Sequence, residues 1–246
     1  MSDVDAAGVS MGGPILSQTL PTLVITIDGP AGTGKSTVAQ QVADRLGFDF
    51  LDTGAMYRAI ALAAVRRQAD LTDARELAFI ARHARIEFDW SVHPPAIILN
   101  DEPVAHLLRS AEVTAAASRI AVVPAIRRQL VEQQRQIGQE RLRLVTEGRD
   151  QGSIVFPDAG LKIYLDADPV ERARRRVDQL RSRGEVVDPD EILGQIVERD
   201  QRDSGRAAGP LTIAADARVI DTTSLSREKV IETIVELARR RLEEEK

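Results

Sequence analysis

The chain has 246 residues, of which 43% are hydrophobic, and this suits one sizeable core with a small inserted subdomain. Its net charge of -5 argues against a nucleic-acid partner, because nucleic-acid binders usually carry a basic surface. The absence of cysteine excludes disulfides, thiolate nucleophiles and cysteine-bound metals.

No apolar run is long enough to span a membrane, and residues 1–20 lack the basic segment followed by an apolar segment that marks a secretion signal. We therefore expect a cytoplasmic protein without a membrane partner. Residues 1–21 are predicted to form a flexible amino-terminal extension. Nothing in the sequence demands an oligomer, so a monomer is expected.

Short β-type runs alternate with longer helical runs along the chain. The first half is predicted to contain, in order, strand 23–27, helix 36–46, strand 48–51, a helix capped by Thr53 that runs to about residue 67, and helix 73–84. After helices 109–121 and 124–137, the pattern gives strands 142–146 and 161–165, helices 170–182 and 190–203, strand 217–220 and helix 227–244. Such alternation predicts an α/β fold with a doubly wound parallel sheet.

Residues 85–104 break this rhythm. Two β-type runs, IEFDW and AIILN, are joined by a short loop that contains proline, and DEPV follows them. This pattern predicts an antiparallel hairpin with a third short strand, inserted into the α/β fold.

The strongest motif is GPAGTGKS, which fits the phosphate-binding pattern G-x-x-x-x-G-K-[ST] and lies between a predicted strand and a predicted helix. Its glycines let backbone N–H groups point at phosphate oxygens, and the helix amino terminus adds partial positive charge. Lys35 is expected to reach the β- and γ-phosphates, and the Ser36 hydroxyl to bind Mg²⁺. The predicted ATP-binding residues are Gly29, Pro30, Ala31, Gly32, Thr33, Gly34, Lys35, Ser36 and Thr37.

The motif alone names no reaction. A GTPase switch would read guanine through N-K-x-D, which is absent, because the single asparagine, Asn100, precedes Asp101. A motor or helicase subunit would show an acidic pair after an apolar strand, and Asp166-Ala-Asp168 is only a loose match. A protein kinase uses a different glycine loop.

Three further clusters favour a small phosphotransferase. Thr53 and Arg58 follow the second strand, and residues 147–150, Glu-Gly-Arg-Asp, follow the strand at 142–146. Both segments fall at the carboxyl edge of a doubly wound sheet, where ligands bind. The third cluster is a pair of arginine-rich helices that could close over a transferring phosphoryl group and exclude water. Of its seven arginines, at positions 172, 174, 175, 176, 199, 202 and 206, we expect two or three to contact phosphate.

Taken together, five segments resemble the bacterial cytidylate kinases, a branch of the nucleoside monophosphate kinases. They are ITIDGPAGTGKST, LDTGAMYRAIALAA, EGRDQGSIVFPDA, KIYLDAD and ERDQRDSGRAAGPL. The resemblance runs from about residue 23 to 238, and its specificity comes from the order and spacing of the segments. It implies a core at 22–52, 139–169 and 207–246, a monophosphate-binding region at 53–138 that contains the insertion, and a lid at 170–206.

The resemblance also implies residue roles. Ser118, Arg127 and Asp150 match residues that read cytosine, and Arg58, Arg149 and Arg206 match arginines that hold the acceptor phosphate. Arg199 and Asp203 match residues that contact the ribose. Thr53 stands where a serine is common, and Ser36 matches a position that varies.

The expected reaction is direct in-line transfer of the γ-phosphoryl group of ATP to CMP, and also to dCMP, with Mg²⁺ as cofactor. The expected catalytic residues are Lys35, Arg149 and the lid arginine Arg175. A kinase for UMP, AMP, shikimate or dephospho-coenzyme A is the alternative within this class. A nucleotide-dependent switch or regulatory subunit is the alternative from another class.

Overall fold

The structure is a computed structural model, and it describes residues 22–206 and 209–244. The predicted extension at 1–21 lies outside the described residues. No helix in the described part of the chain combines the length and the apolar character needed to cross a membrane.

Five parallel strands form the central sheet, in the order β2-β6-β1-β7-β8. They are β1 (Leu23–Asp28), β2 (Asp49–Asp52), β6 (Arg143–Glu147), β7 (Leu161–Asp166) and β8 (Arg218–Asp221). Because β1 lies in the middle and pairs with both β6 and β7, its carboxyl end is flanked by the loops that follow those two strands. The predicted α/β fold with a parallel sheet is confirmed.

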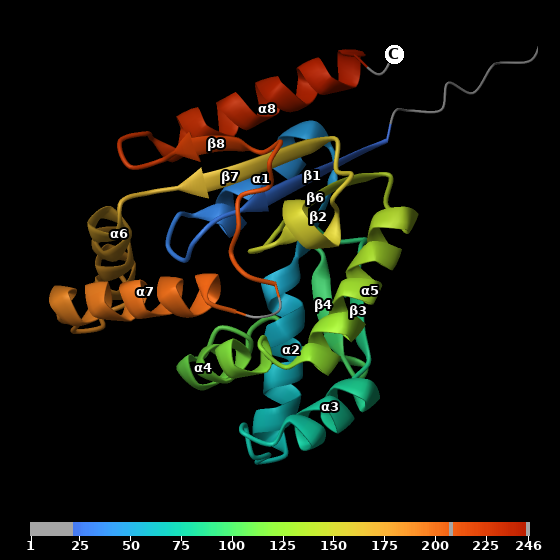
Figure 1. The fold of residues 1–246 in the computed structure, drawn as a ribbon, viewed down its shortest axis with the longest axis vertical. Helices are drawn as coiled ribbons and strands as arrows, with labels where there is room; N and C mark the ends of the chain where they lie inside the picture. The colour runs from blue at the N-terminus through green and yellow to red at the C-terminus, as the bar shows by residue number, and fades with distance from the viewer. Residues whose placement is uncertain (1–21, 207–208, 245–246) are drawn as a thin grey trace, which may run out of the picture.

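Helices α1 (Lys35–Leu46) and α8 (Arg227–Glu244) cover one face of the sheet, above it in Figure 1. Alternate β1 residues, Leu23, Ile25 and Ile27, pack into the hydrophobic core on this face. The side chains between them, including Thr26 and Asp28, therefore point to the opposite face.

The opposite face carries α2 (Thr53–Arg66), α3 (Ala74–His83), α4 (Ala111–Ile120) and α5 (Pro124–Glu140), which build the largest hydrophobic cluster. The expected cap of α2 is wrong by one residue. Asp52 caps this helix by accepting a hydrogen bond from the Ala55 N–H group at 2.8 Å.

The predicted antiparallel insertion is confirmed. Strands β3 (Ile86–Asp89), β4 (Ala96–Leu99) and β5 (Glu102–Pro103) form a separate three-stranded sheet. Ile86, Ile97 and Leu99 anchor it to the cluster around α2.

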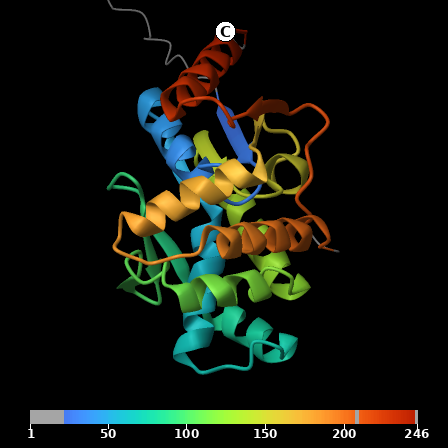
Figure 2. The same ribbon diagram turned by 90° about the vertical axis from the view of Figure 1, so that its left-hand side faces the viewer.

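Helices α6 (Pro169–Arg181) and α7 (Pro189–Ser204) form a pair beyond the carboxyl end of β7. Figure 2 shows them side by side, and they share a small core of their own, made of Ala173, Val177, Leu180, Ile192 and Ile196. We call this helix pair the lid.

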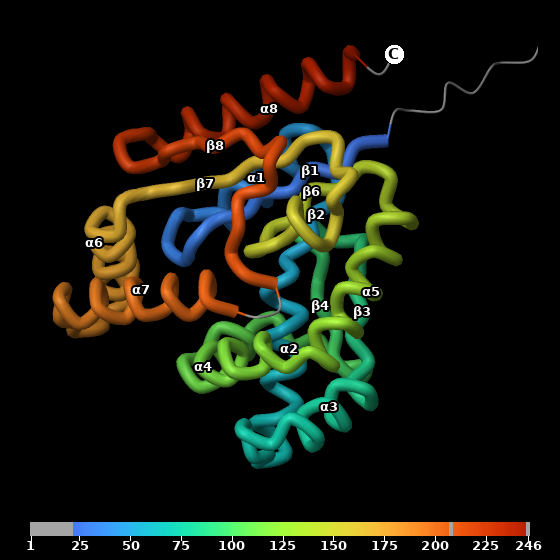
Figure 3. The backbone as a smooth tube through the Cα atoms, in the orientation of Figure 1, coloured from blue at the N-terminus to red at the C-terminus, as the bar shows by residue number. Residues whose placement is uncertain are grey.

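One element was not predicted, a π-helical turn, η1 (Gln151–Val155), directly after Asp150. Figure 3 shows the chain returning from α7 to β8 past this turn. The hydroxyl of Thr212 contacts that of Ser153 at 3.3 Å, so the returning chain touches the turn.

Candidate active site

The phosphate-binding loop lies between β1 and α1, as predicted. Gly29 has φ of +146°, and a Cβ atom there would overlap the carbonyl oxygen of Leu165. Only glycine therefore fits at this position. Gly34, with φ of +86°, ends the loop at the amino terminus of α1, where backbone N–H groups and the helix dipole favour an anion.

Lys35 is buried within this loop, 6% exposed, and donates a hydrogen bond to the Pro30 carbonyl at 2.6 Å. Burial, reinforced by the nearby Arg149, lowers the pKa of Lys35 well below its usual value. The buried Thr33 hydroxyl also donates to Pro30, at 3.1 Å. Thr37, on the first turn of α1, is exposed.

Glu147, the last residue of β6, lies in the predicted cluster at residues 147–150, but the sequence predicted no role for it. Its carboxylate accepts a 2.7 Å hydrogen bond from the Ser36 hydroxyl. It is buried, and burial together with the neighbouring Asp52 raises its pKa. Its position at the end of an apolar strand is the sequence feature that could have indicated a site residue. The contact with Ser36 could not be predicted, because it depends on β6 pairing with β1.

Four arginines converge on two carboxylates next to the phosphate loop. Arg58 pairs with Asp52 at 2.8 Å. Asp203, 1% exposed, accepts a hydrogen bond from the Arg149 Nε at 2.9 Å, pairs with Arg206, and lies 3.9 Å from the Arg199 Nε. We call the set of Arg58, Arg149, Arg199 and Arg206 the arginine cluster.

The arginine cluster has an excess of positive charge, because its four guanidinium groups are paired with only two carboxylates, those of Asp52 and Asp203. Burial, together with Arg149, lowers the pKa of Arg199 to about 10. Burial opposes ionisation of Asp203, but Arg149 and Arg206 outweigh it and lower the pKa of Asp203. Three Nε groups, those of Arg58, Arg199 and Arg206, are buried without a hydrogen-bond partner among the described residues. Such donors suit a multivalent oxyanion such as phosphate.

Asp150 and Arg127 form a buried ion pair beside the cluster, and both side chains are less than 10% exposed. Burial raises the pKa of Asp150, although Arg127 acts against this rise. Arg127 also lies 3.4 Å from the hydroxyl of Tyr57. The returning chain packs against this pair so closely that a Cβ atom on Gly209 would overlap the Arg127 guanidinium.

Thr53 and Ser118, two other residues predicted to bind the acceptor, are not part of this ion pair. The Thr53 hydroxyl is buried and donates to the Glu147 carbonyl at 2.6 Å. Ser118 is half-buried on α4, and none of the side-chain hydrogen bonds between described residues involves it.

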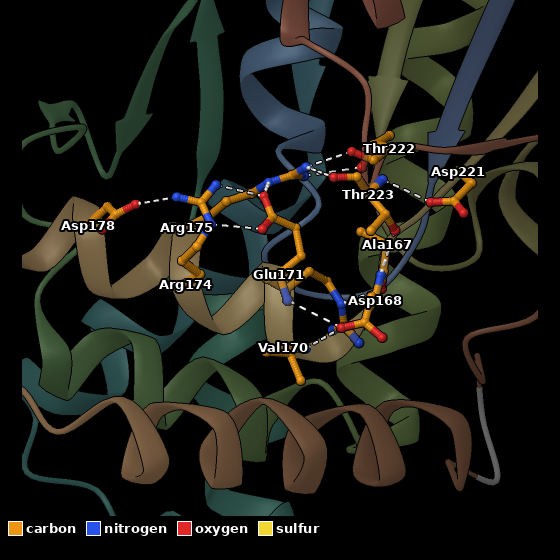
Figure 4. A network of polar contacts seen from close by, with 11 residues as sticks. Ala167, Asp168, Val170, Glu171, Arg174, Arg175, Asp178, Asp221, Thr222 and Thr223 are labelled. Atoms are coloured by element: carbon orange, nitrogen blue, oxygen red, sulfur yellow. Dashed lines mark hydrogen bonds and ion pairs between the residues drawn. The ribbon is translucent and has the colours of Figure 1, made fainter.

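Arg175 is not brought to the arginine cluster. Its guanidinium donates to Glu171 at 2.8 Å and to the Thr222 carbonyl at 2.5 Å, as Figure 4 shows. It lines a hollow of about 450 Å³ together with Thr33 and Gly34 of the phosphate loop, Thr222 to Val230, and the lid helix α6. The hollow therefore opens from the phosphate loop towards the segment between β8 and α8.

The sheet order, the phosphate loop after the central strand, and an arginine cluster under a helical lid define a phosphotransferase of the P-loop kinase class. A family model described as cytidylate kinase matches residues 25–240 of the chain. The cytidylate kinase of Solibacter usitatus is 46% identical, with coverage of 89% of this chain and 94% of that protein. That of Pseudomonas aeruginosa is 47% identical, covering 86% and 93%. The chain belongs to the cytidylate kinase family.

The fold also resembles a solved structure from Eubacterium ventriosum, described as an uncharacterized protein. The TM-score is 0.50 at 14% sequence identity, over 88% of this chain and 97% of that chain. At this identity the likeness concerns the fold alone.

Proposed function

We propose that the chain is a CMP kinase that transfers the γ-phosphoryl group of ATP to CMP and dCMP. The observation that carries this proposal is the buried Asp150–Arg127 pair directly beside the arginine cluster. A carboxylate can accept from the exocyclic amine of cytosine, and a guanidinium can donate to its ring carbonyl. Uracil has a carbonyl in place of that amine. A carboxylate and a carbonyl are both acceptors, so they cannot form a hydrogen bond with each other.

The arginine cluster suits the acceptor phosphate. Its excess of two positive charges and its three unpartnered Nε groups match a dianionic group. Within this proposal Arg58, Arg149 and Arg206 hold the phosphate, while Arg199 and Asp203 contact the ribose. Thr53 and Ser118 remain proposed contacts; because the Thr53 hydroxyl donates to the Glu147 carbonyl, it would contact the substrate as an acceptor.

ATP is proposed to lie with its phosphates in the loop from Gly29 to Thr37 and its base in the hollow beside it. The contacts of Arg175 support a role as a wall of that hollow. A catalytic role at the transferring phosphoryl group would require this side chain to leave Thr222. Lys35 belongs to the loop and Arg149 is near enough to lower its pKa, so these two are the proposed catalytic residues.

Ser36 and Glu147 fit a Mg²⁺ ion, because both are hard oxygen donors and the buried carboxylate has a raised pKa that a cation would lower. Bound there, Mg²⁺ would neutralise charge on the ATP phosphates. The described residues hold no group of three or more His, Asp or Glu side chains that could bind a metal without a substrate.

The acceptor phosphate oxygen is already anionic, so in-line transfer needs no general base, and positioning and charge stabilisation carry the rate. The lid would exclude water, which would otherwise compete as acceptor. A cytoplasmic location and a monomeric state stay predictions.

The test is ADP formation from MgATP with CMP, dCMP, UMP, AMP, GMP and shikimate offered separately. Turnover on CMP at least 100-fold more efficient than on UMP is expected, because a mismatched polar partner in a buried site costs several kcal/mol. Preference for another acceptor would overturn the cytosine assignment. ATP binding without turnover on any acceptor would favour a nucleotide-dependent switch.

A further inference from the structure

Asp28 is a buried charged group to which the proposed mechanism gives no role. It is the last residue of β1, directly before Gly29 of the phosphate loop, and it is 4% exposed. One carboxylate oxygen accepts a hydrogen bond from the Gln151 N–H group at 2.9 Å, and the other accepts from that of Gly152 at 2.8 Å.

These two N–H groups open the turn η1, immediately after Arg149 and Asp150. On the other side of this pair, the Gly148 N–H group donates to the carbonyl of Ile27 at 3.1 Å. The end of β1 therefore holds the chain both before and after the residues that are proposed to bind phosphate and base.

The turn itself has little freedom to move. A Cβ atom on Gly152 would lie 2.8 Å from the Thr26 hydroxyl and 3.3 Å from the Lys162 side chain. Ordinary side-chain contacts are longer than this, so the backbone of η1 packs directly on β1 and β7. With the Asp28 carboxylate in place, the segment has one position on the sheet.

Burial raises the pKa of Asp28 to about 6, even though both N–H groups and Lys35 favour the charged form, while Asp150 opposes it. Asp28 is thus charged at neutral pH in an environment that disfavours charge. The presence of a charged residue at this buried position is better explained by the two hydrogen bonds that it accepts than by packing.

We propose that Asp28 is a positioning residue that fixes Arg149 and Asp150 relative to the phosphate loop, so that a single strand end sets the distance between donor and acceptor. This inference rests on the proposed function, because it takes Arg149 and Asp150 as acceptor contacts. The two hydrogen bonds that the Asp28 carboxylate accepts come from backbone N–H groups, so it acts on Arg149 and Asp150 through the backbone of the turn.

The test compares Asp28→Asn with Asp73→Asn in the full chain. Asp73, on the exposed start of α3, is the control: a single oxygen of its carboxylate accepts from two successive N–H groups, those of Arg75 and Glu76, so asparagine can keep both hydrogen bonds there. Asparagine keeps the shape of Asp28 but can accept only one of these two hydrogen bonds, since each carboxylate oxygen serves a different N–H group and the NH₂ group would face the second one.

For Asp28→Asn we expect kcat to fall at least tenfold and the KM for CMP to rise at least fivefold, with ATP affinity within twofold of wild type. Asp73→Asn should match wild type in all three. Kinetics for Asp28→Asn within twofold of the control, or equal losses in CMP and ATP binding, would overturn the positioning role.

If Asp28→Asn does not fold, the wild-type protein decides. The amide protons of Gln151 and Gly152 should shift in NMR spectra as the carboxylate titrates, and unchanged resonances between pH 5 and 7.5 would refute the contact. If wild type and Asp73→Asn prefer another nucleotide over CMP, the substrate proposal fails. Asp28 is then tested with that nucleotide.

Discussion

At the scale of single residues, the Asp150–Arg127 pair has two consequences that a surface pair would not have. Both side chains are nearly inaccessible, so each is stabilised chiefly by the other. A bound base would compete for the same oxygens and N–H groups. Recognition at such a site is strict, because a ligand with the wrong donor pattern leaves a buried charge unpaired.

This reasoning predicts the behaviour of Asp150→Asn. The amide presents a donor as well as an acceptor, so kcat/KM for CMP should fall about 100-fold, roughly 2.7 kcal/mol of transition-state binding. The preference for CMP over UMP should narrow to less than tenfold. Steady-state kinetics with both acceptors measure this, and Asp158→Asn, an exposed change in the following turn, should leave both values unchanged.

Loss of stability could mimic part of that result, because Asp150→Asn leaves the Arg127 charge less well paired. Urea unfolding separates the two effects. An Asp150→Asn protein that is folded at the assay temperature and still discriminates CMP from UMP as wild type does would contradict the base-reading role.

At the scale of elements, the lid is attached to the phosphate loop by one buried side chain. Arg172, 3% exposed, donates to the Ala31 carbonyl at 3.0 Å and to the Ala167 carbonyl at 2.9 Å, and pairs with Asp200 at 2.7 Å. It therefore joins the phosphate loop, the end of β7 and α7. Because Asp200 is next to Arg199, this attachment also locates part of the arginine cluster.

We predict that Arg172→Lys lowers kcat at least tenfold, because a single ammonium group cannot reach three acceptors that belong to three elements. ATP hydrolysis in the absence of an acceptor should rise relative to transfer, since a looser lid admits water. The control is Arg176→Lys on the same helix, where the arginine is exposed and donates a hydrogen bond to Gln179. Equal activity of the two variants would show that the lid does not depend on Arg172.

Most elements could be predicted from the sequence because their signals are local. Most strands end at aspartate, β6 is followed by Gly148, and the phosphate motif fixes β1 and α1. The turn η1 could not, since a π-helical turn has no local pattern and here depends on Asp28, more than 120 residues earlier. The capping error at α2 arose because Asp52 and Thr53 are adjacent and both suit a cap.

The candidate site also contains parts that the sequence could predict and parts that it could not. The residues of the phosphate loop and the arginine-rich segments were recognised from composition and order. Contacts between distant segments were not, and these include Ser36 with Glu147, Arg172 with Asp200, and Arg175 with Thr222. The first and third depend on which strands are neighbours in the sheet, and the second on how α6 packs against α7; sequence periodicity specifies neither.

At the scale of the whole molecule, the buried carboxylates at the end of β1 and β6 lower stability at neutral pH. The pKa of Asp28 rises from the usual 3.8 to about 6, and burial also raises the pKa values of Glu147 and Asp150. A carboxyl with a higher pKa in the folded chain binds its proton more tightly when folded. Its stabilising contribution is therefore complete below about pH 3.8 and is lost as the pH rises through 6.

For Asp28 the loss amounts to about 3 kcal/mol at neutral pH, since one pKa unit corresponds to about 1.4 kcal/mol. About 2 kcal/mol of this should appear between pH 4.5 and 7.5. Other buried groups near Asp28, among them Lys35 and Asp150, have shifted pKa values as well, so the informative quantity is the difference in free energy of unfolding between variant and wild type. We predict that Asp28→Asn gains about 2 kcal/mol in free energy of unfolding relative to wild type over this pH range.

Urea unfolding of both proteins at several pH values measures this difference. The unpaired N–H group in the variant adds a cost of 1–3 kcal/mol that does not depend on pH, so the slope with pH, and not the offset, tests the prediction. A flat difference would mean that Asp28 is already ionised in the folded protein at pH 4.5, so that burial does not raise its pKa. A rising difference, combined with loss of turnover, would show that this carboxylate is retained at the expense of stability because it aligns the two substrate sites.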